Sequence, residues 1–177
     1  TALPKGSDAW LLAPASALGL VWASTWEHGS AERWIDDGLP IVEAGVLFGC
    51  VVQIVKFSAG RRRPFVHEAE PGREAEPDDN LSFFSGHTGS AFAYAPAAGT
   101  VAHLRGYRLE PVIWASGLVV AATTAYLRIP ADKHWFSDVV VGAVLGSAVG
   151  VAVPRFLHHR TLTGVPTGDG VLVSGRF

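Results

Sequence analysis

The feature that most constrains this chain is a series of charge-poor stretches, each about as long as a helix. They are rich in Ala, Gly, Val and Leu, and they cover residues 9–26, 39–55, 81–104, 111–127 and 139–154 of 177. Polar links such as 27–38 separate them. Apolar segments of this length joined by short links predict an all-α protein, a single bundle of about five core helices.

The remaining sequence indicates one domain and a different kind of segment at its end. A chain of this length buries one sizeable core, so we predict a single helical domain over residues 1–160. Residues 161–177 hold four glycines and Pro166 around a short apolar run, which predicts an extended tail. Pro14 and Pro96 fall inside two of the apolar stretches, and we expect them to bend or break those helices. The single Cys50 excludes an intrachain disulfide and a cysteine-based zinc site.

Composition leaves the surroundings of the helices open. The chain is 49% apolar and 17% charged, with a mean hydropathy of +0.26, which lies between soluble and membrane-embedded bundles. Three stretches fall slightly short of the about 20 residues that a spanning helix needs. If five helices alternate in direction, the polar segments 56–80, 85–87 and 128–138 meet at one end of the bundle, whether the bundle is soluble or embedded in a membrane. A net charge of −2 offers no basic field for nucleic acid.

The first of these polar segments carries a spaced pair of cations. Lys56 closes an apolar stretch and Arg63 follows seven positions later, a spacing that returns to nearly the same helical face if the helix continues. Pro64 disfavours helix at Arg63, so we expect the chain to turn away there. A cation at a buried helix end indicates an anion nearby, although such residues also serve only to complement the helix dipole.

The second segment reads Ser85-Gly86-His87 at the start of the third apolar stretch. Ser85 is a plausible helix N-cap. Backbone N–H groups at a helix start bind anions, and glycine allows a close approach. Capping alone also explains the motif, so by itself it is weak.

The third segment holds Arg128, His134 and Asp138. If the last helix begins near His134, this residue and Asp138 are at i and i+4 and share one face. A carboxylate bonded to one imidazole nitrogen fixes the tautomer and leaves the other nitrogen free to attack. The same row continues through small residues that would let another helix approach closely, namely Gly142, Gly146 and Gly150.

An acidic segment, residues 67–80, joins the first two clusters and must lie near the mouth of the site. Its six carboxylates and two prolines predict a solvated loop. As a hypothesis, it forms a lid whose acids pair with Arg61, Arg62 or Arg73 when the site is empty and repel small, highly charged anions. Bulk solvation of the loop is the alternative.

Taken together, the three clusters resemble the signature of the type 2 phosphatidic acid phosphatase superfamily, which also includes class A bacterial acid phosphatases and vanadium-dependent haloperoxidases. That signature reads Lys-x6-Arg-Pro, Pro-Ser-Gly-His and Ser-Arg-x5-His-x3-Asp, and its order and spacing match here over roughly residues 39–155. Phe84 stands in place of the usual proline and Leu127 in place of the usual serine. We expect these two departures to alter packing and to leave activity intact.

The resemblance implies a hydrolase of phosphoric esters that uses a phosphohistidine intermediate and no metal or cofactor, although vanadate or phosphate would occupy its site. His134 would attack phosphorus, Asp138 would orient it, and His87 would protonate the leaving oxygen. The non-bridging oxygens would be held by Lys56, Arg63, Arg128, Ser85 and Gly86. The implied substrates are phosphomonoesters or diphosphates, and an apolar bundle favours those of lipids, such as phosphatidic acid, a polyprenyl diphosphate or lipid A.

The resemblance also implies an exported bacterial protein, periplasmic or in a membrane with its site facing the periplasm. Two alternatives stay open. One is a vanadium-dependent haloperoxidase, because vanadate fits the same cationic cup. The other is a helical bundle without enzymatic activity that binds anionic lipid headgroups, although an oriented histidine would have no use there. The sequence does not indicate an oligomeric state.

Overall fold

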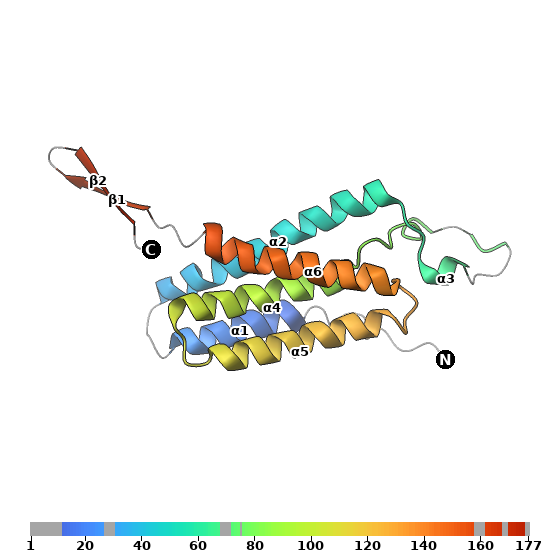
Figure 1. Ribbon diagram of the computed structural model, residues 1–177, viewed down its shortest axis with the longest axis horizontal. Coiled ribbons are helices and arrows are strands. Elements are labelled where there is room, and N and C mark those ends of the chain that lie inside the picture. Colours follow the sequence, from blue (N-terminus) through green and yellow to red (C-terminus); the bar gives the residue numbers. More distant parts are fainter. Residues whose placement is uncertain are drawn as a thin grey trace.

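The structure, a computed structural model, describes residues 12–26, 31–67, 72–74, 76–157, 162–167 and 170–175. Within these residues the architecture is a bundle of five long helices (Figure 1), α1 (Leu12–Trp26), α2 (Ala31–Ala59), α4 (Gly86–Arg105), α5 (Glu110–Arg128) and α6 (Phe136–Ala152). A short helix, α3 (Pro64–His67), follows α2, and one π-helical segment, η2 (Val153–Leu157), extends α6. The predicted all-α bundle is therefore confirmed.

The second helix is longer than the sequence indicated. It begins at Ala31 and includes most of the polar link that we expected between the first two helices. Asp37 in this part is completely buried, where it accepts hydrogen bonds from Arg105 Nε at 2.6 Å and from the Tyr107 hydroxyl. These partners lie near the end of α4, so a polar stretch becomes part of the helical core through a contact that is distant in sequence.

The prolines do not interrupt the helices. Pro14 lies in the first turn of α1, where a missing N–H costs no intrahelical hydrogen bond. Pro40 and Pro96 lie inside α2 and α4, and both helices continue past them. Of the two expected effects, a break at Pro14 or Pro96 is therefore wrong, and a bend stays a prediction.

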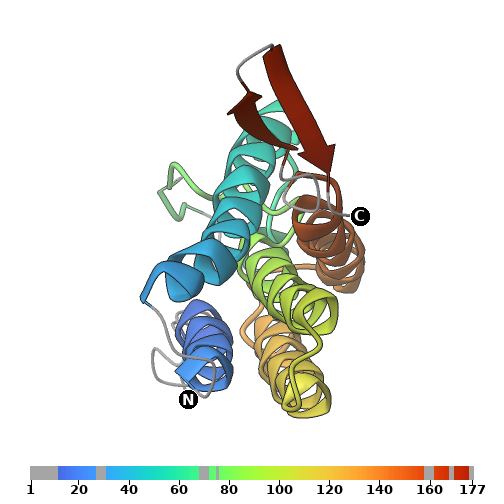
Figure 2. The same ribbon diagram turned by 90° about the vertical axis from the view of Figure 1, so that its left-hand side faces the viewer.

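Helix α4 is the centre of the bundle and packs against each of the other four long helices (Figure 2). Its buried positions are mostly small, so its neighbours approach closely. A Cβ added to Gly146 on α6 would lie 2.2 Å from the main-chain oxygen of Gly89 on α4, and one added to Gly142 would lie 2.7 Å from that of Ser85. The predicted close approach along the glycine row of α6 is confirmed.

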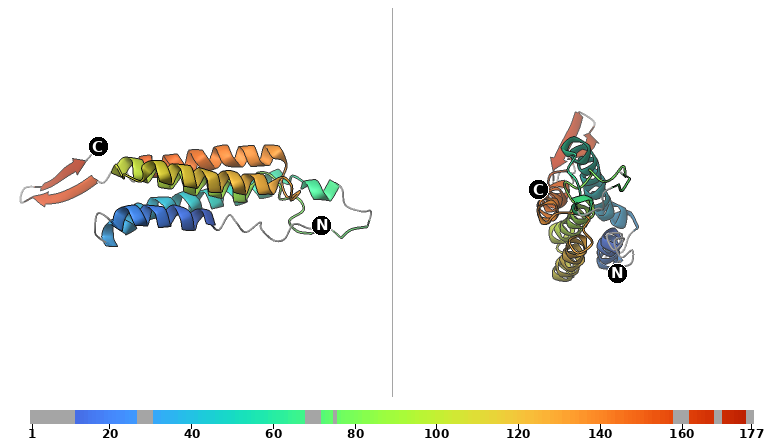
Figure 3. Two further views of the ribbon diagram at one scale, coloured as in Figure 1. Left: turned by 90° about the horizontal axis from the view of Figure 1, so that it is seen from below. Right: turned by 90° about the vertical axis from the view of Figure 1, so that its right-hand side faces the viewer.

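The described part of the C-terminal segment consists of two antiparallel strands, β1 (Leu162–Thr167) and β2 (Gly170–Gly175). Leu162 pairs with Gly175 and Thr167 pairs with Gly170. The hairpin lies beyond one end of the bundle, while α3 lies beyond the other (Figure 3). The first eleven residues lie outside the described ranges.

Three helical segments are long and apolar enough to cross a membrane, namely Arg33–His67, Glu110–Arg128 and Phe136–Phe156. Their outward surfaces carry exposed apolar side chains such as Val46, Ile54, Val119 and Val144. Exposed apolar surface along the full length of several helices is typical of contact with lipid.

Candidate active site

The three polar clusters meet at one end of the bundle, on the right in Figure 1. This end is formed by the last turns of α2 and α5 and the first turns of α4 and α6. It brings together all the residues that the sequence indicated, which are Lys56, Arg63, Ser85, Gly86, His87, Arg128, His134 and Asp138. The predicted convergence of the polar segments is confirmed.

The first cluster turns earlier than we expected. Lys56 lies in the last turn of α2, but that helix ends at Ala59, and Gly60 adopts the left-handed conformation with φ +55° that closes many helices. Arg63 is therefore not on the same continuous helical face as Lys56. Lys56 also lies against the start of α4, since its Nζ would be 3.8 Å from a Cβ added to Gly86.

The second cluster forms the expected cap. Ser85 is the N-cap of α4, and its Oγ accepts a hydrogen bond of 3.5 Å from the N–H of Thr88. The N–H of Ser85 itself donates to the carbonyl of Asp138 at 3.0 Å, which fixes the start of α4 against the start of α6. Phe84, which stands in the proline position, is buried below the site and packs on Phe48 with ring centroids 5.6 Å apart.

The third cluster differs in two respects from the sequence prediction. Helix α6 begins at Phe136, so His134 lies before the helix and shares no helical face with Asp138. His134 Nδ1 donates a hydrogen bond to the carbonyl of Ser82 at 2.8 Å, whereas it lies 3.9 Å from Asp138 Oδ2. That second distance is too long for a hydrogen bond, so the contact with Asp138 is electrostatic.

Two residues that sequence reasoning did not select hold the Asp138 carboxylate. The hydroxyl of Ser82 donates to Oδ2 at 2.5 Å, and Arg61 Nη1 donates to Oδ1 at 2.6 Å. The N–H of Trp135 adds a third bond to Oδ2 at 3.1 Å. Ser82 lies three residues before the Ser-Gly-His motif, but neither its position nor the spacing of Arg61 distinguishes these residues from their neighbours.

His134 is buried, and a hydrogen bond fixes the orientation of its ring. It is 2% exposed, and burial lowers the pKa of its imidazole; the Asp138 carboxylate opposes this shift, while the positive charges of Lys56 and Arg63 add to it. Because the Ser82 carbonyl can only accept, the hydrogen of the neutral ring is on Nδ1 and Nε2 carries the lone pair. This is the protonation state of a nucleophile.

The second site histidine, His87, lies in the first turn of α4 within electrostatic reach of His134. Arg128, Lys56 and Arg63 also act on it through their charges. Two imidazoles and three cations therefore act on one another at this end of the bundle, from the ends of α2, α4 and α5 and from the segments just before α3 and α6. Such an arrangement favours a compact, multiply charged anion.

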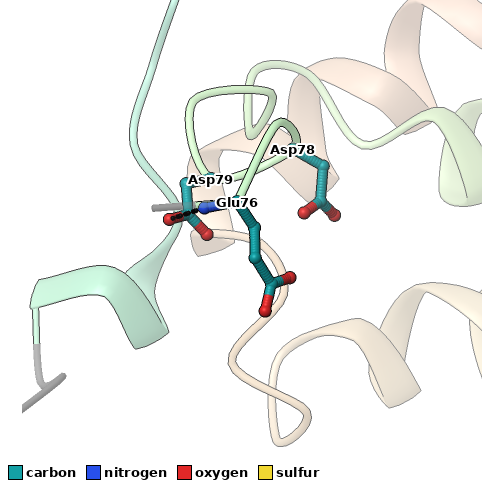
Figure 4. Close-up of side chains that lie close together, drawn as sticks. All are labelled: Glu76, Asp78 and Asp79. Carbon is teal, nitrogen blue, oxygen red and sulfur yellow. Dashed lines mark hydrogen bonds between the residues drawn. The ribbon is translucent and has the colours of Figure 1, made fainter. Parts of the chain in front are cut away.

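The described part of the acidic segment after α3, residues 72–74 and 76–80, is held by ion pairs and hydrogen bonds beside the site. Glu76, Asp78 and Asp79 bring their carboxylates close together, as Figure 4 shows. Asp79 is 4% exposed and accepts two hydrogen bonds from Arg73, at 2.8 and 3.0 Å. Arg63 donates to Asp78 through Nη2 at 3.1 Å and Nε at 2.9 Å, the latter to the main-chain oxygen.

These contacts refine the expectation for the acidic segment. The pairing of its acids with Arg73 is confirmed, and the solvation of Asp79 is wrong. Arg61, by contrast, pairs with Asp138 on α6. All three clustered carboxylates form ion pairs with guanidinium groups, Asp78 with Arg63 and both Asp79 and Glu76 with Arg73, so the charge of the cluster is already largely compensated by the protein.

Fold and site together define a helical bundle in which an oriented histidine and several cations form an anion site at one end. Residues 37–162 match the profile of the PAP2 superfamily, and the chain belongs to that superfamily. With the three membrane-length helices, this places the protein in a membrane.

Two known proteins are similar to this chain. The lipid A 1-phosphatase of Porphyromonas gingivalis (strain ATCC 33277) is 38% identical over 104 residues, which are 59% of this chain and 20% of that protein. The chain thus matches about a fifth of the length of this curated relative. The crystal structure of a transmembrane PAP2-type phosphatidylglycerolphosphate phosphatase from Bacillus subtilis superimposes with a TM-score of 0.59 at 19% identity, covering 87% of this chain and 77% of that one. At that identity the likeness establishes the fold.

Proposed function

We propose that the protein is a metal-independent phosphatase that hydrolyses the phosphate ester or diphosphate of a membrane lipid through a phosphohistidine at His134. The observation that carries this proposal is the buried imidazole of His134, whose Nδ1 is held by a hydrogen bond and whose Nε2 is free of it. Its Nδ1 is fixed by a carbonyl, and its surroundings include Lys56, Arg63 and His87. A site that only bound anions would not need an oriented, unprotonated nitrogen.

The reaction proceeds in two displacements. In the first, the lone pair of His134 Nε2 attacks phosphorus while the bond from phosphorus to the leaving oxygen breaks, and His87 donates a proton to that oxygen. Burial and the surrounding cations lower the pKa of His87 to about 3. A bound phosphate dianion would raise this pKa, so His87 would take up the proton that it donates when the substrate binds. In the second, His87 takes a proton from water, whose oxygen attacks phosphorus while the bond to Nε2 breaks. The products are an alcohol, or a lipid monophosphate from a diphosphate, and inorganic phosphate.

The protein's own cations supply the charge stabilisation. Phosphoryl transfer depends mainly on positioning and on neutralising the equatorial oxygens. Lys56, Arg63 and Arg128 would contact these oxygens together with the N–H group of Gly86 at the start of α4. The N–H of Ser85, which we expected to join them, already donates to the carbonyl of Asp138. Preorganised cations in a partly dry site give this stabilisation without reorganisation during the reaction.

A lipid substrate is supported by the depth at which the site lies. Trp34 near the start of α2 is exposed, and Lys56 follows 22 residues later in its last turn. At 1.5 Å per residue these levels are about 33 Å apart, close to the about 30 Å hydrocarbon thickness of a bilayer. Exposed Tyr126 and half-buried Trp135 lie at the level of the site, as aromatic residues do at a membrane interface. Lipid phosphates occupy the same level.

We propose that the site faces the periplasm of a bacterium, an orientation that requires the N-terminus to lie outside if the five helices alternate in direction. Lys133, exposed beside His134, offers the test. A Lys133→Cys variant that also carries Cys50→Ala should react with a membrane-impermeant maleimide in intact spheroplasts. Labelling only after lysis would show that the site faces the opposite side of the membrane.

The activity itself is tested by phosphate release from the purified protein in detergent. The substrate panel contains lipid A, phosphatidic acid, phosphatidylglycerol phosphate, a polyprenyl diphosphate and a soluble monoester, with His134→Ala as the control. We expect release from at least one lipid phosphate at a kcat/KM well above that for the soluble ester. No release above the His134→Ala background with any member would contradict the proposal, and preference for the soluble ester would contradict the lipid assignment.

A further inference from the structure

The residue that bridges His134 and Asp138 is Ser82. Its main-chain carbonyl accepts the hydrogen bond from His134 Nδ1 at 2.8 Å, and its hydroxyl donates to Asp138 Oδ2 at 2.5 Å. Both Ser82 and Asp138 are completely buried. The carboxylate thus reaches the imidazole ring through Ser82, in addition to its electrostatic contact at 3.9 Å.

Arg61 closes this network from the opposite side. Its main-chain carbonyl accepts a hydrogen bond from the N–H of Ser82 at 3.0 Å. Its guanidinium Nη1 donates to Asp138 Oδ1 at 2.6 Å and to Ser137 Oγ at 2.9 Å, and the group lies over the Trp135 ring, 5.5 Å from its centroid. One residue therefore holds both groups that face His134, Ser82 by its main chain and Asp138 by its side chain.

The geometry points to Arg61 and Ser82 as positioning residues for His134, with Arg61 holding Asp138 and Ser82 in the arrangement that keeps Nδ1 bonded and Nε2 free. This inference rests on the proposed function, because it takes His134 as the nucleophile. It goes beyond that function by assigning the control of the nucleophile to two residues that are not among the phosphate ligands or the proton donors.

The charge of Arg61 has a consequence that a purely structural role would not have. The charged or titratable groups facing His134 are Asp138 of α6, Lys56 of α2, Arg63 of the segment before α3 and His87 of α4. Asp138 is the only anion among these described groups, and Arg61 compensates it directly. Without Arg61, the uncompensated carboxylate would favour the imidazolium form, which is not a nucleophile.

The test compares Arg61→Gln with Arg61→Lys and with Arg62→Gln, a matched control that removes the same charge from an exposed neighbour. Arg61→Gln should lower kcat about 10- to 100-fold, the usual effect of losing such a supporting contact. KM should stay within about twofold. The acid limb of the kcat/KM profile should move to higher pH. Arg61→Lys should recover part of kcat and return the acid limb of the kcat/KM profile to the pH of the wild type. Arg62→Gln should match the wild type in both.

Ser82→Ala retains the carbonyl and loses only the hydroxyl bond to Asp138, so it should also lower kcat with little change in KM. The inference would be overturned if Arg61→Gln raised KM and left kcat unchanged. It would also be overturned if Arg61→Gln and Arg62→Gln changed kcat equally.

A second measurement needs no turnover and separates this inference from the proposed function. The imidazole of His134 is titrated by NMR on histidine-labelled protein, with the resonance identified by its loss in His134→Ala. Its midpoint should rise in Arg61→Gln and stay unchanged in Arg62→Gln. An inactive wild type would refute the phosphatase, whereas an unchanged midpoint in a folded Arg61→Gln protein would refute the positioning role.

Discussion

The ion pair between Asp78 and Arg63 gives a quantitative prediction about access to the site. Arg63 is proposed to bind a substrate oxygen, yet its Nη2 is 3.1 Å from the Asp78 carboxylate, which is 49% exposed. A pair with one partner this exposed contributes about 0.2–1 kcal/mol. A dianionic substrate must displace this carboxylate or bind against its charge. Because about 1.4 kcal/mol corresponds to tenfold in affinity, Asp78→Asn should lower KM by about 1.4- to 5-fold.

The substitution changes little else. The bond from Arg63 Nε to the main-chain oxygen of Asp78 remains in Asp78→Asn, so Arg63 keeps its place and kcat should stay the same. The assay is steady-state hydrolysis of a small dianionic aryl phosphate in detergent, at about 0.02 and 0.5 M salt. The decrease in KM should be larger at low ionic strength. Glu74→Gln, on an exposed position of the same segment, is the matched control and should have the smaller effect.

Either of two results would refute this reasoning. An unchanged KM at low salt would make the pair irrelevant to binding. A higher KM would mean that Asp78 positions Arg63 for the substrate instead of competing with it.

Two further predictions concern the core and the absence of a metal requirement. Gly146→Ala would place a Cβ 2.2 Å from a main-chain oxygen of α4, whereas Gly49→Ala on α2 meets nothing within 4 Å. Gly146→Ala should lower the free energy of unfolding by about 1–3 kcal/mol and the unfolding temperature by about 2–12 °C. Gly49→Ala should leave the unfolding temperature unchanged or raise it. Equal unfolding temperatures of the two variants would contradict the close helix contact. Phosphate release should survive EDTA and be inhibited by vanadate, which imitates five-coordinate phosphorus. Loss of activity on chelation that a divalent metal restores would contradict the metal-independent mechanism, and vanadate-dependent oxidation of halide by peroxide would favour the haloperoxidase.

Much of the fold followed from the sequence because local pattern and burial agree in this chain. The apolar stretches correspond to the five long helices, and the glycine row on α6 marks the closest helix contact. The polar start of α2 could not be recognised, since Asp37 is buried only through its contacts with Arg105 and Tyr107. Those partners lie about 70 positions away in the sequence.

The sequence predicted which residues form the site better than it predicted the hydrogen bonds between them. Motif spacing brought His134 and Asp138 together, but the bond between them was expected from a helical i, i+4 relation that does not exist, because α6 begins after His134. The actual partner of Nδ1 is a main-chain carbonyl, and side-chain identity carries no signal for such a contact. Arg61 and Arg62 are indistinguishable in sequence, and only the turn at Gly60 decides which of them reaches Asp138.

The most direct test of the central claim is the trapping of a phosphoenzyme. The wild type, His134→Ala and His87→Ala are mixed with a phosphate-labelled activated aryl ester and quenched within milliseconds. An acid-labile, base-stable label should form on the wild type. It should be absent from His134→Ala, and it should still form on His87→Ala, since an activated leaving group needs little protonation. A label that persists in His134→Ala and disappears from His87→Ala would show that His134 is not the nucleophile.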